Sequence, residues 1–157
     1  GLTKIKEDDD MRINDALDKF YYSAALCDLR LMNREQQKGS LSFNSMLYLD
    51  IIFFMHGKCT VSKLAELLHV SKPGVTQKIN ELIGQGLVIK TVDAGDRRRN
   101  YLAINEEAAP RYKVYRHQDA AAIEEIAAKY SAEDIEKFCE MLDIVSKNNF
   151  EEITTEP

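Results

Sequence analysis

The most informative part of the sequence is residues 60–83, which read TVSKLAELLHVSKPGVTQKINELI. Leucines recur at helical spacing over residues 62–68 and predict a short helix. A tight turn follows at residues 69–70. Ser71 is a good N-cap for a second helix, and Pro73 falls in its first turn, where a missing N–H costs nothing. A short helix, a tight turn and a second helix form the helix-turn-helix arrangement.

The residues that follow predict a small β-hairpin. The second helix has a predicted buried stripe made of Val75, Ile79, Leu82 and Ile83. Gly86 fits the left-handed position just past the end of this helix. Residues 87–92 and 101–104 have the composition of strands, and a Gly/Asp turn at residues 93–96 separates them. The predicted fold class is therefore mainly α with a small β-wing, a winged helix-turn-helix.

Helices are expected on both sides of this unit. Residues 10–37 carry apolar side chains at alternating steps of four and three, close to a heptad seam. Residues 42–55 are apolar on most faces and predict a central core helix. Asn105 is expected to cap one long helix that ends near Lys129, and Ser131 begins a capping-box motif for a last helix.

Three regions follow from this pattern. Residues 1–40 are expected to form an N-terminal dimerisation helix, residues 41–104 the winged helix-turn-helix, and residues 105–157 the C-terminal dimerisation helices. The terminal helices have apolar stripes that find no partner inside the winged unit, so a two-fold homodimer would bury them.

The charge of the chain is unevenly spread. Hydrophobic residues make up 45% and charged residues 30% of the 157 residues, which is ordinary for a globular protein. The net charge is −5, yet residues 71–99 contain six basic and three acidic residues, giving this segment +3 and the rest of the chain −8. Because salt screens charges beyond about 8 Å, the local surplus governs a docking surface.

The second helix of the motif is the candidate reading element. Such a helix enters the major groove of double-stranded DNA with its N-terminal residues on base edges. Gln77 has the side chain to read an adenine, and the lysines suit phosphate or guanine. The candidate DNA-binding residues on this helix are Ser71, Lys72, Gly74, Thr76, Gln77 and Lys78.

The predicted hairpin carries a run of three arginines, Arg97, Arg98 and Arg99. Three guanidinium groups beside a turn do not help a small hairpin to fold, but the negative potential of a minor groove attracts arginine. We add these three residues to the candidate DNA-binding set. Asp96 is placed to pair with Arg98 and hold the loop in shape.

Several segments resemble the MarR family of bacterial transcriptional regulators. Residues 60–68 followed by Val70-Ser71-Lys72 are similar to its helix-turn-helix, residues 85–88 to its turn into the first wing strand, and residues 96–98 to its acidic-x-arginine wing signature. The resemblance implies a homodimer on a pseudo-palindromic operator. It also implies a repressor relieved by a small-molecule effector that binds between the dimer helices and the DNA-binding unit.

Three positions differ from that family's usual pattern. His69 stands where a turn glycine is common, and histidine tolerates left-handed geometry better than most residues. Gln77 stands where the family often has arginine. Asn105 replaces the usual threonine after the wing.

Other classes of function have weaker support. No phosphate loop, nucleophile elbow or HExxH motif is present, so the chain is not expected to be an enzyme, and no cofactor or metal is expected. His56 and Cys59 are the pair that a metal-sensing regulator would use, and Cys27 is the residue that a redox-sensing regulator would use. The three cysteines are instead expected to be reduced and buried. A winged-helix protein-interaction module without DNA binding is the remaining alternative.

The sequence predicts no membrane partner. No apolar run approaches the roughly 18 residues needed to cross a bilayer. The N-terminal residues are acidic and contain no apolar signal-peptide core, so a cytoplasmic location is expected.

Overall fold

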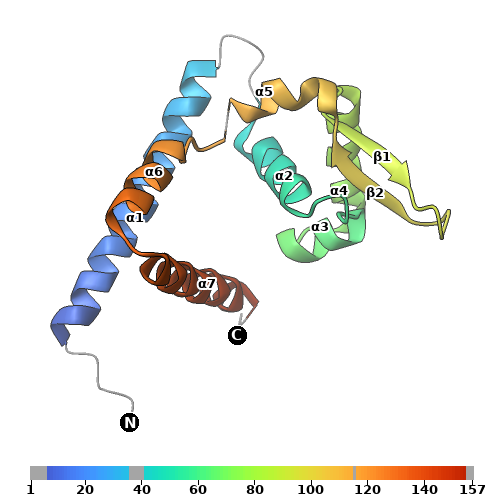
Figure 1. Ribbon diagram of the computed structural model, residues 1–157. Helices are drawn as coiled ribbons and strands as arrows, with labels where there is room; N and C mark the ends of the chain where they lie inside the picture. The colour runs from blue at the N-terminus through green and yellow to red at the C-terminus, as the bar shows by residue number, and fades with distance from the viewer. Residues whose placement is uncertain (1–6, 36–40, 115, 155–157) are drawn as a thin grey trace. The chain divides into compact units, whose positions relative to one another are not determined.

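The computed structural model describes residues 7–35, 41–114 and 116–154 of the chain (Figure 1). The chain divides into two compact units, residues 1–117 and residues 118–157. The described residues form helices and a single two-stranded antiparallel sheet. The predicted fold class, mainly α with a small β-wing, is therefore confirmed.

The first helix, α1, spans Glu7–Glu35 and contains 29 residues. It begins three residues before the predicted start, and the end predicted at residue 37 lies outside the described residues. Its apolar side chains are mostly exposed: Ile13 is 53% and Phe20 59% accessible. The predicted apolar stripe is present on the helix, but the described chain does not bury it.

Helix α2, Phe43–Phe54, supplies the centre of the core as predicted. Ser42 caps it, because the Ser42 hydroxyl accepts the Ser45 N–H at 3.1 Å. Leu49 and Ile52 are almost fully buried. The helix ends at a left-handed break, where His56 has φ 48° and the glycine after it has φ 80°.

The helix-turn-helix consists of α3, Val61–Leu68, and α4, Lys72–Gly84. The Thr60 hydroxyl caps α3, and the Ser71 hydroxyl accepts the Gly74 N–H at 3.2 Å to cap α4. His69 ends α3 in the left-handed conformation, with φ 51° and ψ 41°. The predicted Ser71 cap and the predicted turn are confirmed, whereas the Thr60 cap was not predicted.

The wing is a hairpin of β1, Val88–Val92, and β2, Asn100–Ile104 (Figure 1). The register pairs Val88 with Ile104 at the base and Val92 with Asn100 near the tip. Cys59 joins the sheet as an isolated bridge, since its carbonyl accepts the Leu102 N–H at 2.8 Å. The start of α3 is thereby attached to the second wing strand.

One hydrophobic core holds α2 to α5 and the wing together. Its members come from every element of the winged unit. The most deeply buried side chains are Leu49, Ile52, Cys59, Leu64, Val75, Ile79, Leu82, Leu87, Val88, Leu102 and Tyr112. Three of the four predicted stripe residues of α4 are in this set, while Ile83 lies partly buried at its edge.

The long helix predicted from Asn105 to Lys129 is wrong. Asn105 caps a 3-10 turn, η2, Glu106–Ala108, and α5 spans only Ala109–Lys113. Helix α6 starts again at Ala120 and ends at Lys129.

Tertiary contacts account for this interruption. Tyr112 is buried and its hydroxyl donates to Asp50 of α2. The Arg116 guanidinium lies 4.1 Å from the centre of the Phe53 ring, and His117 lies 2.9 Å from an Asp28 carboxylate oxygen. These contacts hold the chain in a path that helical propensity alone does not predict.

The second compact unit consists of α6 and α7, Ala132–Thr154. The predicted capping box is confirmed: the Ser131 hydroxyl accepts the Asp134 N–H, and the Asp134 carboxylate accepts the Ser131 N–H, both at 3.2 Å. No residue whose side chain is described in this unit is buried. Cys139 is exposed, so the prediction that all three cysteines are buried is wrong for this residue; Cys27 is half-buried and Cys59 buried.

None of the described helices combines the length and the apolar character that crossing a membrane would need.

Candidate nucleic-acid interface

The N-terminal half of α4 presents a polar edge on one side and a core face on the other. Ser71, Lys72, Thr76 and Gln77 are exposed. Val75 and Ile79 are fully buried on the opposite side. The helical period therefore separates the side chains that hold the helix in place from those that are free to meet a ligand. The sequence predicted this division.

Gly74 lies between these two faces and is needed for close packing. A Cβ atom added there would lie 3.1 Å from the Val70 side chain and 3.2 Å from the Ser71 hydroxyl. Both distances are tighter than ordinary van der Waals contacts. The glycine thus allows the loop between α3 and α4 to pack closely against the first turn of α4. It also leaves this position of the helix surface without a side chain.

Lys78 differs from the other predicted basic contact residues because it forms a salt bridge. Its ammonium nitrogen lies 3.1 Å from a Glu81 carboxylate oxygen, and its side chain is only 15% exposed. Glu81 also accepts a hydrogen bond from Gln85 at 3.4 Å. A phosphate that binds Lys78 must therefore compete with this carboxylate.

Two aspartates shape the turn of the wing. The Asp93 carboxylate accepts the Gly95 N–H at 2.7 Å and the Tyr101 hydroxyl at 3.3 Å. The pKa of Asp93 is lowered, and the largest cause is the hydrogen bond from the Gly95 N–H. Hydrogen bonds from Tyr101 and the Asp96 backbone and the charge of Arg99 lower it further, whereas desolvation acts in the opposite direction.

Asp96 holds the backbone of the arginine run. Its carboxylate accepts the Arg98 N–H at 2.9 Å, and its carbonyl accepts the Arg99 N–H at 2.9 Å. We expected Asp96 to pair with Arg98, and it does so through the Arg98 backbone rather than through the guanidinium group. The charge of Arg98 is therefore left for another partner.

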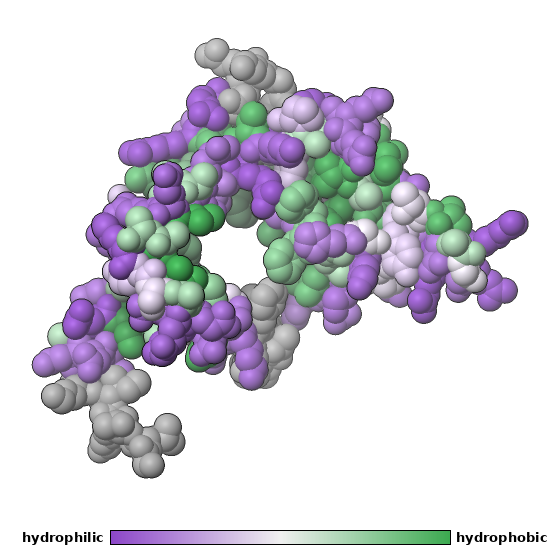
Figure 2. Space-filling model, viewed as in Figure 1, coloured by the Kyte–Doolittle hydropathy of each residue, from purple (hydrophilic) through white to green (hydrophobic). Residues whose placement is uncertain are grey.

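The three wing arginines are exposed, and their guanidinium groups form no salt bridge with any described residue. Figure 2 shows hydrophilic side chains projecting from the wing, at the right of the view. A turn fixed by two aspartates thus presents Arg97, Arg98 and Arg99 to solvent.

A groove between the start of α3 and the wing contains residues that the sequence interpretation missed. Lys58, Thr60, Ser62 and Lys63 line one side of it. Arg98, Arg99, Asn100 and Tyr101 line the other side, and Met55 and Val61 complete it. The groove therefore has four basic lining residues and no acidic one.

The N-terminus of α3 also faces this groove, and its free N–H groups and helix dipole favour an anion. Lys63 is paired with Glu66 at 3.1 Å, but both side chains are largely exposed, so this pair is weak. The pairing of Cys59 with β2 creates the groove. The signal in the sequence was the spacing of Lys58 and Lys63 around the Thr60 cap.

The residues proposed for metal and redox sensing do not converge. Cys59 is buried, and burial raises the pKa of its thiol to about 11. In residues 7–35, 41–114 and 116–154, no three His, Cys, Asp or Glu side chains are grouped so that they could hold a metal ion.

Residues 41–99 match the family model described as "MarR family". The matched segment begins just before α2 and ends at the last wing arginine, so it contains the exposed edge of α4, β1 and the wing turn but not β2. Over these residues the chain is similar to the MarR family. Because the members of this family are DNA-binding transcriptional regulators, the match supports a regulator of transcription rather than an enzyme.

Solved structures share the fold of this chain. FabT of Streptococcus pneumoniae, solved in complex with DNA, is 21% identical, with 87% of this chain and 94% of FabT covered and a TM-score of 0.60. A mutant of MepR from S. aureus is 16% identical, with 84% and 96% covered and a TM-score of 0.63. Another MepR mutant, bound to an oligodeoxyribonucleotide, is 16% identical, with 84% and 96% covered and a TM-score of 0.52. No curated protein sequence matches the chain.

Proposed function

We propose that this protein is a homodimeric repressor that binds a pseudo-palindromic site on double-stranded DNA and is released by a small-molecule effector in the cytoplasm. Residues 41–104 are the DNA-binding part. The edge formed by residues 71–78 enters the major groove, and Arg97, Arg98 and Arg99 bind in the adjacent minor groove.

The main support for this proposal is that two exposed features, the edge of α4 and the wing arginines, belong to one compact unit. The edge of α4 offers hydroxyl, amide and ammonium groups, which are the groups that read bases and bind phosphates. The wing offers three guanidinium groups that form no salt bridge with a described carboxylate. FabT and a MepR mutant, which share this fold, were solved with DNA.

The basic groove adds a third contact to the same surface. Lys58 and Lys63 lie across it from Arg98 and Arg99. We propose that a backbone phosphate binds there, because phosphate contacts fix the register of a protein on the duplex without reading sequence.

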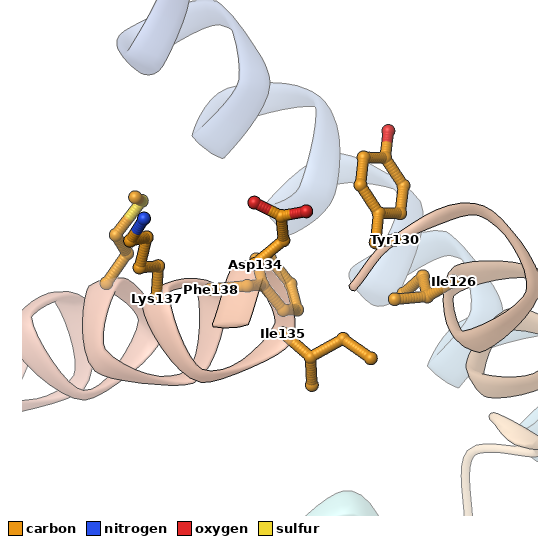
Figure 3. A pocket seen from close by; sticks show the side chains of 7 residues that line it. Ile126, Tyr130, Asp134, Ile135, Lys137 and Phe138 are labelled. Carbon is orange, nitrogen blue, oxygen red and sulfur yellow. The ribbon is translucent and has the colours of Figure 1, made fainter. Parts of the chain in front are cut away.

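The homodimer is supported by apolar surface outside the winged unit. In α7, Phe138, Met141 and Ile144 are 46%, 60% and 62% exposed. Figure 3 shows an apolar groove between the end of α6 and the start of α7, with the side chains of Ile126 and Phe138 on either side of it. We propose that a second copy of the chain fills this groove and covers the apolar stripe of α1.

Release by an effector follows from the geometry of a two-fold dimer. Two recognition helices must be about 34 Å apart to read successive major grooves. A ligand that binds more tightly to a dimer with another spacing would shift the population away from DNA. No residue is assigned to such a ligand.

The test is binding of the full chain to a fluorescent duplex pool of random sequence at several salt concentrations. We expect enrichment of a sequence with two-fold symmetry and a steep linear fall of log affinity with log salt, since each neutralised phosphate contributes a slope of about −0.9. The absence of binding to any duplex would contradict the proposal and would favour the protein-interaction module.

A further inference from the structure

The recognition helix α4 ends in a Schellman motif. The Gly86 N–H donates to the Ile83 carbonyl and the Leu87 N–H to the Leu82 carbonyl, both at 2.9 Å, and Gly86 has φ 72°. These two bonds satisfy carbonyls inside the helix. The carbonyls of Gln85 and Gly86, which lie beyond the helix end, are left to find partners elsewhere in the chain.

Asn105 binds the second of these carbonyls. Its side-chain amide donates to the Gly86 carbonyl at 2.8 Å, and its backbone N–H donates to the Leu87 carbonyl at 2.9 Å. Its side-chain oxygen accepts the Glu107 N–H at 3.2 Å. Asn105 follows directly on Ile104, the last residue of the wing. One half-buried side chain thus joins the end of the recognition helix, the base of the wing and the start of η2.

Arg111 binds the first carbonyl. Its guanidinium group donates to the Gln85 carbonyl at 3.4 Å. Helix α4 has no basic residue in its own last turn, so Arg111 supplies the positive charge that a helix C-terminus favours. Arg111 is itself held in place, because the neighbouring Tyr112 is buried and donates to Asp50.

We propose that Asn105, assisted by Arg111, is a positioning residue for DNA reading. The two side chains fix the angle between the recognition helix and the wing, so that both engage one duplex at the same time. This inference rests on the proposed function.

The expected signature is a loss of selectivity. Base contacts depend on tenths of an ångström, whereas long lysine and arginine side chains reach phosphates from several backbone positions. The hydrophobic core of the winged unit contains Leu82, Leu87 and Leu102, all fully buried, and Asn105 is not a member of it. Loosening the junction should therefore weaken binding to the selected sequence more than binding to DNA in general.

The experiment compares the full-length protein with Asn105→Ala and Asn105→Asp on two duplexes. One carries the sequence that the unmodified protein enriches from a random pool, and the other carries the same bases in shuffled order. Asn105→Asp keeps the acceptor for the Glu107 N–H but removes the donor to the Gly86 carbonyl. We expect the ratio of the two affinities to fall about tenfold in both variants, with affinity for the shuffled duplex unchanged.

Ser42→Ala is the matched control for stability. Ser42 caps α2 and lies outside the proposed DNA-contacting set, so its loss lowers the melting temperature without touching the helix–wing junction. The affinity ratio should be unchanged in this variant. An equal fall of the ratio in Ser42→Ala and in the Asn105 variants would overturn the inference, as would an unchanged ratio in the Asn105 variants.

Arg111 gives an independent test should an Asn105 variant fail to fold. Arg111→Gln should lower the affinity ratio, and Arg111→Lys, which keeps the charge at the helix end, should restore most of it. If Arg111→Gln instead lowers the affinity for both duplexes equally and makes the salt slope shallower, Arg111 is a phosphate contact. That result would overturn its positioning role. If the unmodified protein binds DNA and enriches a sequence while these variants keep its selectivity, this inference fails and the proposed function stands.

Discussion

The winged unit and the helices outside it differ in how they bury apolar surface. In residues 41–114 the core contains eleven side chains with less than 2% exposure. In α6 and α7 no described side chain is buried, and α1 leaves Ile13, Phe20 and Leu29 more than half exposed. The first region completes its core within one chain, and the second does not.

In the proposed function, this difference separates DNA reading by the winged unit from dimerisation by the other helices. A unit that presents a reading edge must hold its backbone in one conformation, and close packing within one chain achieves this. Helices that assemble two copies must instead keep their apolar side chains available for the partner.

The largest expected effect is in the core of the winged unit. Leu102 is fully buried in β2, so Leu102→Ala should lower the free energy of unfolding by about 2–5 kcal/mol. Urea denaturation monitored by circular dichroism measures this loss. Ile144→Ala on α7, where the side chain is 62% exposed, is the control and should change the stability of the monomer very little. Equal losses in the two variants would contradict the difference between the regions.

The next effect concerns association of two copies. Phe138→Asp together with Met141→Asp places two charges on the apolar face of α7 and should weaken dimerisation about a hundredfold. Sedimentation velocity over a range of protein concentrations measures this change. Asp143→Asn lies on the opposite side of the helix and should leave association unaltered. Unaltered association in the aspartate variant would remove α7 from the proposed interface.

A smaller effect is expected in the basic groove. Lys58→Gln together with Lys63→Gln should lower affinity equally for all duplexes and make the salt slope shallower by about 1, because both lysines line the groove that is proposed to bind one phosphate. Fluorescence anisotropy against salt concentration measures both changes. Lys129→Gln on α6 is the matched loss of charge and should leave the slope as it is. A sequence-dependent loss of affinity in the double variant would contradict a phosphate contact.

The smallest effect is the pH response of the wing turn. The folded state lowers the pKa of Asp93 below its ordinary value of 3.8. The carboxylate therefore stabilises the turn at any pH above 3.8, and this contribution is lost as the pH falls below 3.8 towards the folded pKa. The protection factor of the Gly95 amide, which is the exchange rate corrected for its intrinsic pH dependence, should be constant at neutral pH and fall as the pH drops below 3.8. Asp93→Asn should show no such step; a step that persists in this variant would assign the response to another group.

The sequence predicted the winged unit well because its signals are local. The Ser71 cap, the left-handed His69 and Gly86, and the alternation of core and edge residues in α4 each depend on a few neighbouring residues. The exposed positions of Ser71, Lys72, Thr76 and Gln77 followed from the helical period.

Prediction from the sequence failed where contacts between distant residues determine the local structure. The helix predicted from Asn105 to Lys129 is interrupted because Tyr112 and Arg116 contact α2, and no local pattern reveals those partners. The basic groove also stayed hidden, since it forms only when Cys59 pairs with β2 and brings the start of α3 to the wing. The pairing of Lys78 with Glu81 was not predicted, although their i,i+3 spacing allows it.

The most direct measurement compares two substitutions on the exposed surface of the winged unit by fluorescence anisotropy. Arg97→Gln together with Arg98→Gln should weaken binding to the selected and the shuffled duplex alike and make the salt slope shallower by about 2. Gln77→Ala should weaken binding to the selected duplex alone and leave the slope unchanged. Affinities that stay the same in both variants would show that neither the edge of α4 nor the wing touches DNA.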